Sequence, residues 1–369
     1  MSSVTKSRYL NIDALRGVAA FLVVLCHLFG SRSIFTNFIA PEKLSFFNVL
    51  YVIPAYGYAG VFLFFVISGF CIHLRWAKAY SKGDKSPKID FIAFWKRRWI
   101  RLYPAYLAAI LLYLVWHYSQ GELNFNTLFA WDVIAHTLMV HNFDSRTVYS
   151  INSVFWTLAI EEQLYLIYFL LLWMRNTLGW KFTLIACFLA RFVWFGFILL
   201  LNRAFSIEIP VNEGALANWW IWALGALAVE NYLGIVKFPK WCYSLLLAFG
   251  FILVAACLRY YGLFTPTYFS ERLTWLFEAL FWGAGFFFLT NWIMQYENQL
   301  KSFVMRNFVK ICAAVGLFSY SLYLVHDFIL GAFAGYSKLL LVFMTLAFAY
   351  IFFLLFEKPF MLYLSKQRN

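Results

Sequence analysis

An arginine and a histidine lie eleven residues apart within one apolar segment near the start of the chain. Arg16 and His27 both belong to residues 10–30. On an α-helix this spacing amounts to about three turns, so both side chains project from one face, about 16 Å apart along the axis. A histidine can exchange a proton near neutral pH. The pair therefore indicates a proton-transferring centre. A packing histidine and an arginine that reaches the membrane surface are the alternatives for each residue alone.

Two adjacent carboxylates lie deep in another apolar segment. Glu161 and Glu162 are neighbours, and Tyr165 follows Glu161 by one helical turn. A charge inside a membrane helix is costly and indicates function by default. The sequence leaves three interpretations open: a catalytic or binding site, the proton relay of a transporter, and a buried ion pair with Arg191 or Arg16.

Polar side chains recur in a late apolar segment. Ser319 and Tyr320 could form hydrogen bonds between helices, which is a common role of polar residues in membranes. His326 and Asp327 follow near the predicted outer end of the segment, at a depth comparable with that of His27. Helix–helix bonding and substrate binding both remain open for these residues.

Two arginines lie one helical turn apart in a strongly basic stretch. Arg98 and Arg101 have the i, i+3 spacing that makes them neighbours on a helix surface. Two guanidinium groups can bind phosphate bidentately, whereas lysine offers only a point charge. The alternative is an anchor on anionic lipid. Residues 76–101, with aromatic residues between the charges, predict an amphipathic helix at the cytoplasmic interface.

The composition requires lipid as the solvent of these segments. Hydrophobic residues make up 63% of the 369 residues and charged residues 13%, whereas soluble domains are about half apolar and a quarter charged. We predict an all-α bundle of about ten transmembrane helices in one domain, 1–369, because lipid leaves few other ways to satisfy a spanning backbone. The predicted spans are 10–30, 56–75, 102–119, 152–174, 181–201, 214–233, 242–260, 271–292, 308–330 and 336–356. Glu357 then follows as a helix stop and interfacial anchor.

The loop charges predict that both termini are cytoplasmic. With that orientation the inner loops carry about three times as many Lys and Arg residues as the outer loops. This bias accounts for the net charge of +13 without nucleic acid as a partner. None of the six cysteines belongs to a Cys-x-x-Cys pair, and we expect neither a disulfide framework nor a metal site.

Six sequence motifs follow one another along the chain. They are IDALRGVAAFLVVLCH (12–27), FLFFVISGFCI (62–72), FWKRRWIRLYPAY (94–106), VFWTLAIEEQLYL (154–166), GLFSYSLYLVH (316–326) and FEKPF (356–360). In this order they resemble the acyltransferase-3 family of membrane O-acyltransferases, which includes O-antigen acetylases. The resemblance covers nearly the whole chain, and because the chain stops at Asn369 it resembles the stand-alone members without an SGNH domain.

The resemblance implies a role for each matching residue. His27 would be the catalytic centre with Arg16 as its partner, and Glu161 would belong to the same site. Arg98 and Arg101 would bind the phosphates of coenzyme A. The weaker expectations for substrate binding are Glu162, Tyr165, Ser319, Tyr320 and His326.

The function that follows is the transfer of an acyl group, expected to be acetyl, from cytoplasmic acyl-CoA to a hydroxyl of a cell-surface or lipid-linked glycan such as lipopolysaccharide. Acyl-CoA is a co-substrate here, and no tightly bound cofactor is expected. The resemblance also implies the bacterial inner membrane. A transporter or lipid flippase that uses the buried His, Glu and Arg residues as a proton relay is the alternative.

Overall fold

The computed structural model describes residues 9–30, 35, 37, 46–84, 86–205, 208–296 and 302–367, and every regular element among them is helical. This confirms the predicted all-α bundle. The α-helices are α1 (Leu10–Phe29), α3 (Val52–Ala55), α4 (Gly60–Ser81), α5 (Phe91–Ser119), α6 (Thr127–Thr137), α7 (Trp156–Leu166), α8 (Tyr168–Phe205), α9 (Ala215–Tyr232), α10 (Leu245–Phe264), α11 (Tyr268–Gln295), α12 (Phe303–Leu317), α13 (Ser319–Ala332), α14 (Lys338–Phe352) and α15 (Lys358–Lys366).

Seven helices in the described part of the chain are long and apolar enough to cross a membrane, and the bent pair α12–α13 would make an eighth. Two predicted boundaries change. The span expected over 152–174 is broken at Ile167, between α7 and α8. The expected break before 181 is a kink within α8 at Gly179, whose φ of 73° suits glycine best.

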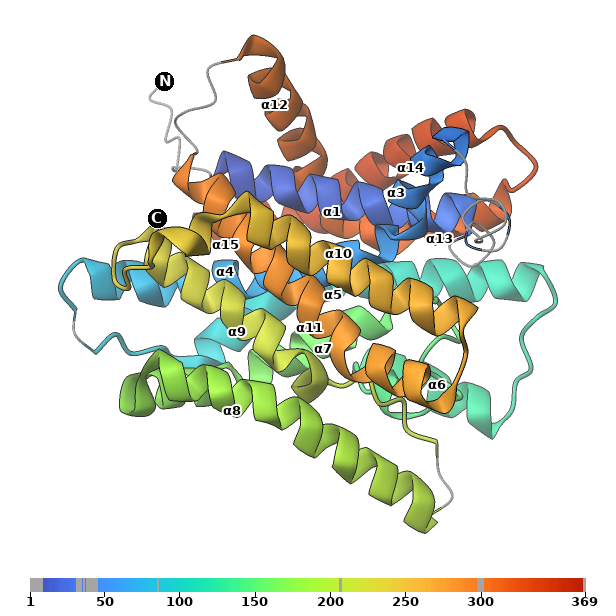
Figure 1. Cartoon of the computed structure of the whole chain (residues 1–369). Coiled ribbons are helices and arrows are strands. Elements are labelled where there is room, and N and C mark those ends of the chain that lie inside the picture. Colours follow the sequence, from blue (N-terminus) through green and yellow to red (C-terminus); the bar gives the residue numbers. More distant parts are fainter. Residues whose placement is uncertain are drawn as a thin grey trace, which may run out of the picture.

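The span expected over 308–330 is two helices that meet at an angle of 75°. Phe318 has non-helical backbone angles and separates α12 from α13. Reciprocal glycines hold α12 against α1: a Cβ on Gly17 would lie 1.9 Å from the carbonyl oxygen of Cys312, and one on Gly316 would lie 1.8 Å from that of Asp13. Such close backbone packing is typical of membrane helices. In Figure 1, α12 points upward, across the direction of α1.

Residues 76–101 do not form one interfacial helix. α4 continues to Ser81, the chain turns at Gly83 with φ 103°, and α5 begins only at Phe91. The Asp90 carboxylate caps this start by accepting a hydrogen bond from the amide of Ala93 at 2.9 Å. Because α5 then runs unbroken to Ser119, Arg98 and Arg101 belong to the first turns of a spanning helix.

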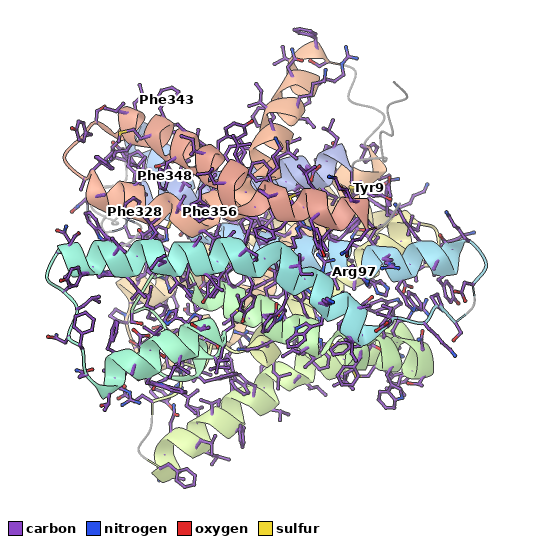
Figure 2. The ribbon with its side chains drawn as sticks, turned by 180° about the vertical axis from the view of Figure 1, so that it is seen from behind. Tyr9, Arg97, Phe328, Phe343, Phe348 and Phe356 are labelled. Atoms are coloured by element: carbon purple, nitrogen blue, oxygen red, sulfur yellow. The ribbon has the colours of Figure 1, made fainter. Side chains whose placement is uncertain are left out.

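The two ends of the bundle are easily told apart. α1 begins and α15 ends at the same end, at the left of Figure 1, and we call this the inner end because the loop charges predict that it faces the cytoplasm. Figure 2 shows Tyr9 and Arg97 toward this end, and Phe328 and Phe343 toward the opposite, outer end. These labelled residues mark the two regions in which the candidate site residues lie.

Candidate active site

A cavity of about 100 Å³ lies among α1, α4, α5, α7 and α13. It is large enough for several water molecules. Seven of the ten residues expected from the sequence line it, together with four polar residues that were not expected. The polar lining residues are Arg16, Ser68, Arg98, Arg101, Thr157, Glu161, Tyr165, Ser319, Tyr320, Tyr323 and Glu357.

Three guanidinium groups converge on this cavity from two helices. Arg16 comes from α1, whereas Arg98 and Arg101 come from α5. The Arg98 guanidinium lies 5.7 Å from the ring centre of Tyr165, and Arg16 approaches Asp13 at 3.9 Å. The buried Nε of Arg101 has no hydrogen-bond partner among the described residues. Three arginines with an unused buried donor form a setting suited to a multiply charged anion.

Glu161 is held in the cavity wall by hydroxyl groups. Its carboxylate accepts hydrogen bonds from Ser68 Oγ at 2.6 Å and from the Tyr165 hydroxyl. The proposed ion pair with Arg191 is wrong, because Arg191 donates to the backbone carbonyls of Ala217 and Trp275, each at 2.6 Å. Glu161 and Arg16, the other partner that the sequence left open, both line the cavity.

Glu162 does not line this cavity. Its Oε1 accepts hydrogen bonds from the indole nitrogens of Trp95 at 2.6 Å and Trp99 at 2.9 Å, so it fastens α7 to the first turns of α5. The arrangement indicates a residue that positions Arg98 and Arg101 on α5.

His27 lies outside the cavity, in the outer half of α1. Its Nδ1 is 3.3 Å from Asp327 Oδ1, and the other oxygen of Asp327 accepts a hydrogen bond from Ser153 at 3.2 Å. The side chains of His27 and Asp327 are 26% and 32% exposed. The structure thus brings His27 together with Asp327, whereas Arg16, its expected partner, lies with the cavity arginines.

His326 lies between the histidine–aspartate pair and the cavity. Its ring is fully buried and meets the His27 ring edge to face, with centroids 4.9 Å apart. The ring of Tyr323, one turn earlier on α13, is 5.8 Å from that of His326 and lines the cavity. The Tyr323 hydroxyl is bonded to Thr157 Oγ1 at 2.8 Å. His326 and Tyr323 therefore form a chain of contacting side chains between His27 and the cavity.

Comparison with known proteins assigns the chain to a family. The family described as "Acyltransferase domain" matches residues 9–356. The chain belongs to the acyltransferase-3 family. This membership agrees with the resemblance that the six motifs indicate.

Individual relatives match over shorter stretches. This acyltransferase-3 chain is 28% identical to acyltransferase MdmB of Streptomyces mycarofaciens over 42% of its own length and 37% of that protein. It is 30% identical to the peptidoglycan O-acetyltransferase OatA of Listeria monocytogenes over 45% of its length and 25% of that protein. It is 37% identical to the O-acetyltransferase OatA of Staphylococcus aureus over 30% of its own length and 19% of that protein. The matches thus span well under half of each relative. No solved structure matches the chain.

The structure adds residues to this acyltransferase-3 site that the sequence did not identify. Glu357 ends a π-helical turn, Phe353–Glu357, is 1% exposed, and accepts a hydrogen bond from Ser321 Oγ at 2.7 Å. The interpretation as an interfacial anchor was therefore wrong. A π-turn rotates the residues that follow it, so helical periodicity could not place Glu357. For the contact between His27 and Asp327, the signal in the sequence was that both residues were predicted to lie at a comparable depth.

Two polar residues of α13, Ser319 and Tyr320, combine hydrogen bonding with a place in the cavity wall. Tyr320 donates from its hydroxyl to the carbonyl of Leu102 on α5 at 3.1 Å, and Ser319 donates to Gly316 at 3.0 Å. Both also line the cavity. Helix–helix bonding is thus part of what these residues do, and it leaves the ring of Tyr320 in the cavity wall.

Proposed function

We propose that this chain transfers an acyl group from acyl-CoA, bound through the inner end of the bundle, to a hydroxyl group of a glycan that approaches from the outer end. The observation that carries this proposal is the two-sided arrangement. An arginine-lined cavity and a partly exposed histidine–aspartate pair are connected by the contacting side chains of Tyr323 and His326.

The donor is assigned to the cavity. The phosphates of coenzyme A carry several negative charges, and Arg16, Arg98 and Arg101 offer three planar guanidinium groups to bind them. This places Arg16 with the donor phosphates. Glu161, fixed by Ser68 farther along the wall, would accept a hydrogen bond from an amide of the pantetheine arm. The arm would carry the thioester toward His27.

The chemistry is assigned to His27. Asp327 holds the proton on Nδ1, which leaves the lone pair on Nε2. Nε2 takes the proton of the acceptor hydroxyl while the oxygen attacks the thioester carbonyl. The tetrahedral intermediate then collapses, the carbon–sulfur bond breaks, and the sulfur receives a proton. An ester and free coenzyme A result. An acyl-histidine intermediate is the alternative course of the same reaction.

The acceptor is proposed from the relatives. Two of those named above are O-acetyltransferases, one of them described as acting on peptidoglycan. We therefore propose acetyl as the acyl group and a bacterial cell-surface or lipid-linked glycan as the acceptor. The further proposal that the chain lies in the bacterial inner membrane comes from the family resemblance. The alternative of a transporter or flippase has no comparable support.

The test is the release of coenzyme A from acetyl-CoA by the purified protein in liposomes supplied with glycan acceptor. Wild-type protein should release coenzyme A and acetylate the glycan, as detected by mass spectrometry. His27→Ala should bind acetyl-CoA normally and turn it over at least 10²-fold more slowly, because general base catalysis contributes about 10²–10⁴-fold. A transporter would show no acetyl transfer in either protein, and that result would refute the proposed function.

A further inference from the structure

One ring nitrogen of a fully buried histidine is unused. His326 has no exposed surface, and its Nδ1 lies 2.8 Å from the carbonyl oxygen of Tyr323 and 3.2 Å from that of Leu322. Carbonyl oxygens only accept hydrogen bonds, so Nδ1 carries the ring proton. The lone pair therefore resides on Nε2, which has no partner among the described residues. A buried polar atom without a partner is rare and calls for an explanation.

This nitrogen belongs to a pair of histidines with matching tautomers. The Nδ1 of His27 is hydrogen-bonded to the Asp327 carboxylate, and the Nδ1 of His326 is hydrogen-bonded to the backbone carbonyl of Tyr323 in its own helix. Each ring therefore carries its lone pair on Nε2. With the ring centroids 4.9 Å apart, a proton released from one ring needs to travel only a short distance to the other.

The pair also bridges two differently exposed regions. His27 and Asp327 are about one-quarter to one-third exposed, whereas His326 is fully buried. Tyr323, whose backbone carbonyl accepts from His326, lines the donor cavity. His326 is thus a titratable side chain that contacts His27 on one side and Tyr323, which lines the cavity, on the other.

We propose that His326 is a second catalytic residue, which carries the proton from His27 to the departing sulfur of coenzyme A. This inference rests on the proposed function. His27 Nε2 removes the proton from the acceptor hydroxyl and passes it to His326 Nε2. When the carbon–sulfur bond breaks, the sulfur leaves with the bonding electron pair and takes this proton, which restores both neutral histidines. One acyl ester and one thiol form, and no other reactant is required.

The fold offers a matched control for the loss of a buried imidazole at position 326. Another fully buried histidine, His141, stacks on His136 with ring centroids 3.8 Å apart, and neither of its ring nitrogens has a partner among the described residues. It lies in the outer connection between α6 and α7 and lines no part of the cavity. His141 is therefore a matched control for the loss of a buried imidazole.

The experiment compares two donors with one preparation of each protein. Acetyl-CoA is used alongside its selenium analogue, in which selenium replaces the thioester sulfur. A selenolate is much less basic than a thiolate, and a less basic leaving group departs more readily without a proton. The phosphates and the arm are identical, so donor binding is unchanged. His326→Gln and His326→Ala are tested against wild type and His141→Gln, with acetyl-CoA binding measured to verify folding.

The proposal predicts a donor-specific defect. His326→Gln should lose about 10²-fold or more of the wild-type rate with acetyl-CoA and much less with the selenoester, whereas His141→Gln should show the same ratio to wild type with both donors. Equal losses with both donors in protein that binds acetyl-CoA would overturn the relay and leave a positioning role. An unimpaired rate with acetyl-CoA would overturn it as well. Inactivity of the wild type with both donors would instead count against the proposed function.

Discussion

Asp327 offers a direct test of how the histidine–aspartate pair, His27 and Asp327, takes part in the reaction. As His27 takes a proton in the transition state, its ring becomes positive at 3.3 Å from the Asp327 carboxylate. Coulomb's law gives this contact about 1.3 kcal/mol in water and about 5 kcal/mol at an effective dielectric constant of 20. Because both side chains are partly exposed, we take a value near the lower bound, about 2 kcal/mol. Asp327→Asn should then reduce kcat about 30-fold.

The assay separates this effect from donor binding. Initial rates of coenzyme A release are measured over a range of acetyl-CoA concentrations at saturating acceptor. The KM for acetyl-CoA should stay within about twofold of wild type, because Asp327 does not line the arginine cavity. Ser153→Ala, which removes only the outer hydrogen bond to Asp327, is the control and should change kcat less. An unchanged kcat in Asp327→Asn, or an effect confined to KM, would refute the reasoning.

Three further predictions concern the donor site, the helix packing and the outer loop. Arg101→Ala should weaken acetyl-CoA binding about tenfold to a hundredfold in a binding titration, because a hydrogen bond to a charged group contributes about 1.5–3 kcal/mol. Arg101→Lys should restore part of the loss, and unchanged affinity in both variants would show that Arg101 does not bind the donor. Gly316→Ala should lower the melting temperature in detergent, since its Cβ would lie 1.8 Å from the Asp13 carbonyl oxygen, and a melting temperature equal to that of wild type would disprove this packing. The hydrogen bonds from Arg146 lower the pKa of Asp144 to about 2 from 3.8. This pair therefore stabilises the outer loop above pH 4, and the stabilisation is lost as the pH falls toward 2. Arg146→Ala should reduce the acid dependence of unfolding over that range, and unfolding curves with the same pH dependence in wild type and variant would contradict this.

The sequence could predict what depends on depth along a helix. Charges inside apolar segments marked Arg16, Glu161 and His27, and the i, i+3 spacing marked Arg98 and Arg101. All but His27 line one cavity. These predictions succeed because lipid makes each buried charge costly wherever it occurs.

The same reasoning could not predict contacts between helices. Depth alone could not show that Asp327 touches His27, because the partner of a helix face depends on which helices are neighbours. The 75° bend at Phe318 occurs where α12 packs against α1 through close glycine contacts, and the inward position of Glu357 follows a π-turn. Each is decided by tertiary packing rather than by local periodicity.

The separation of the exposed pair from the cavity has an electrical consequence. Under the proposed mechanism the acceptor gives up its proton on the outer side, and coenzyme A withdraws to the inner side. If the sulfur withdrew as a thiolate, a negative charge would move toward the negative face of the membrane, at a cost of up to about 2.3 kcal/mol per 100 mV for a full crossing. With the proton delivered through His326, the sulfur withdraws as a neutral thiol. Turnover in proteoliposomes should therefore be independent of the membrane potential for the wild type, and should become slower with an inside-negative potential once His326 is replaced.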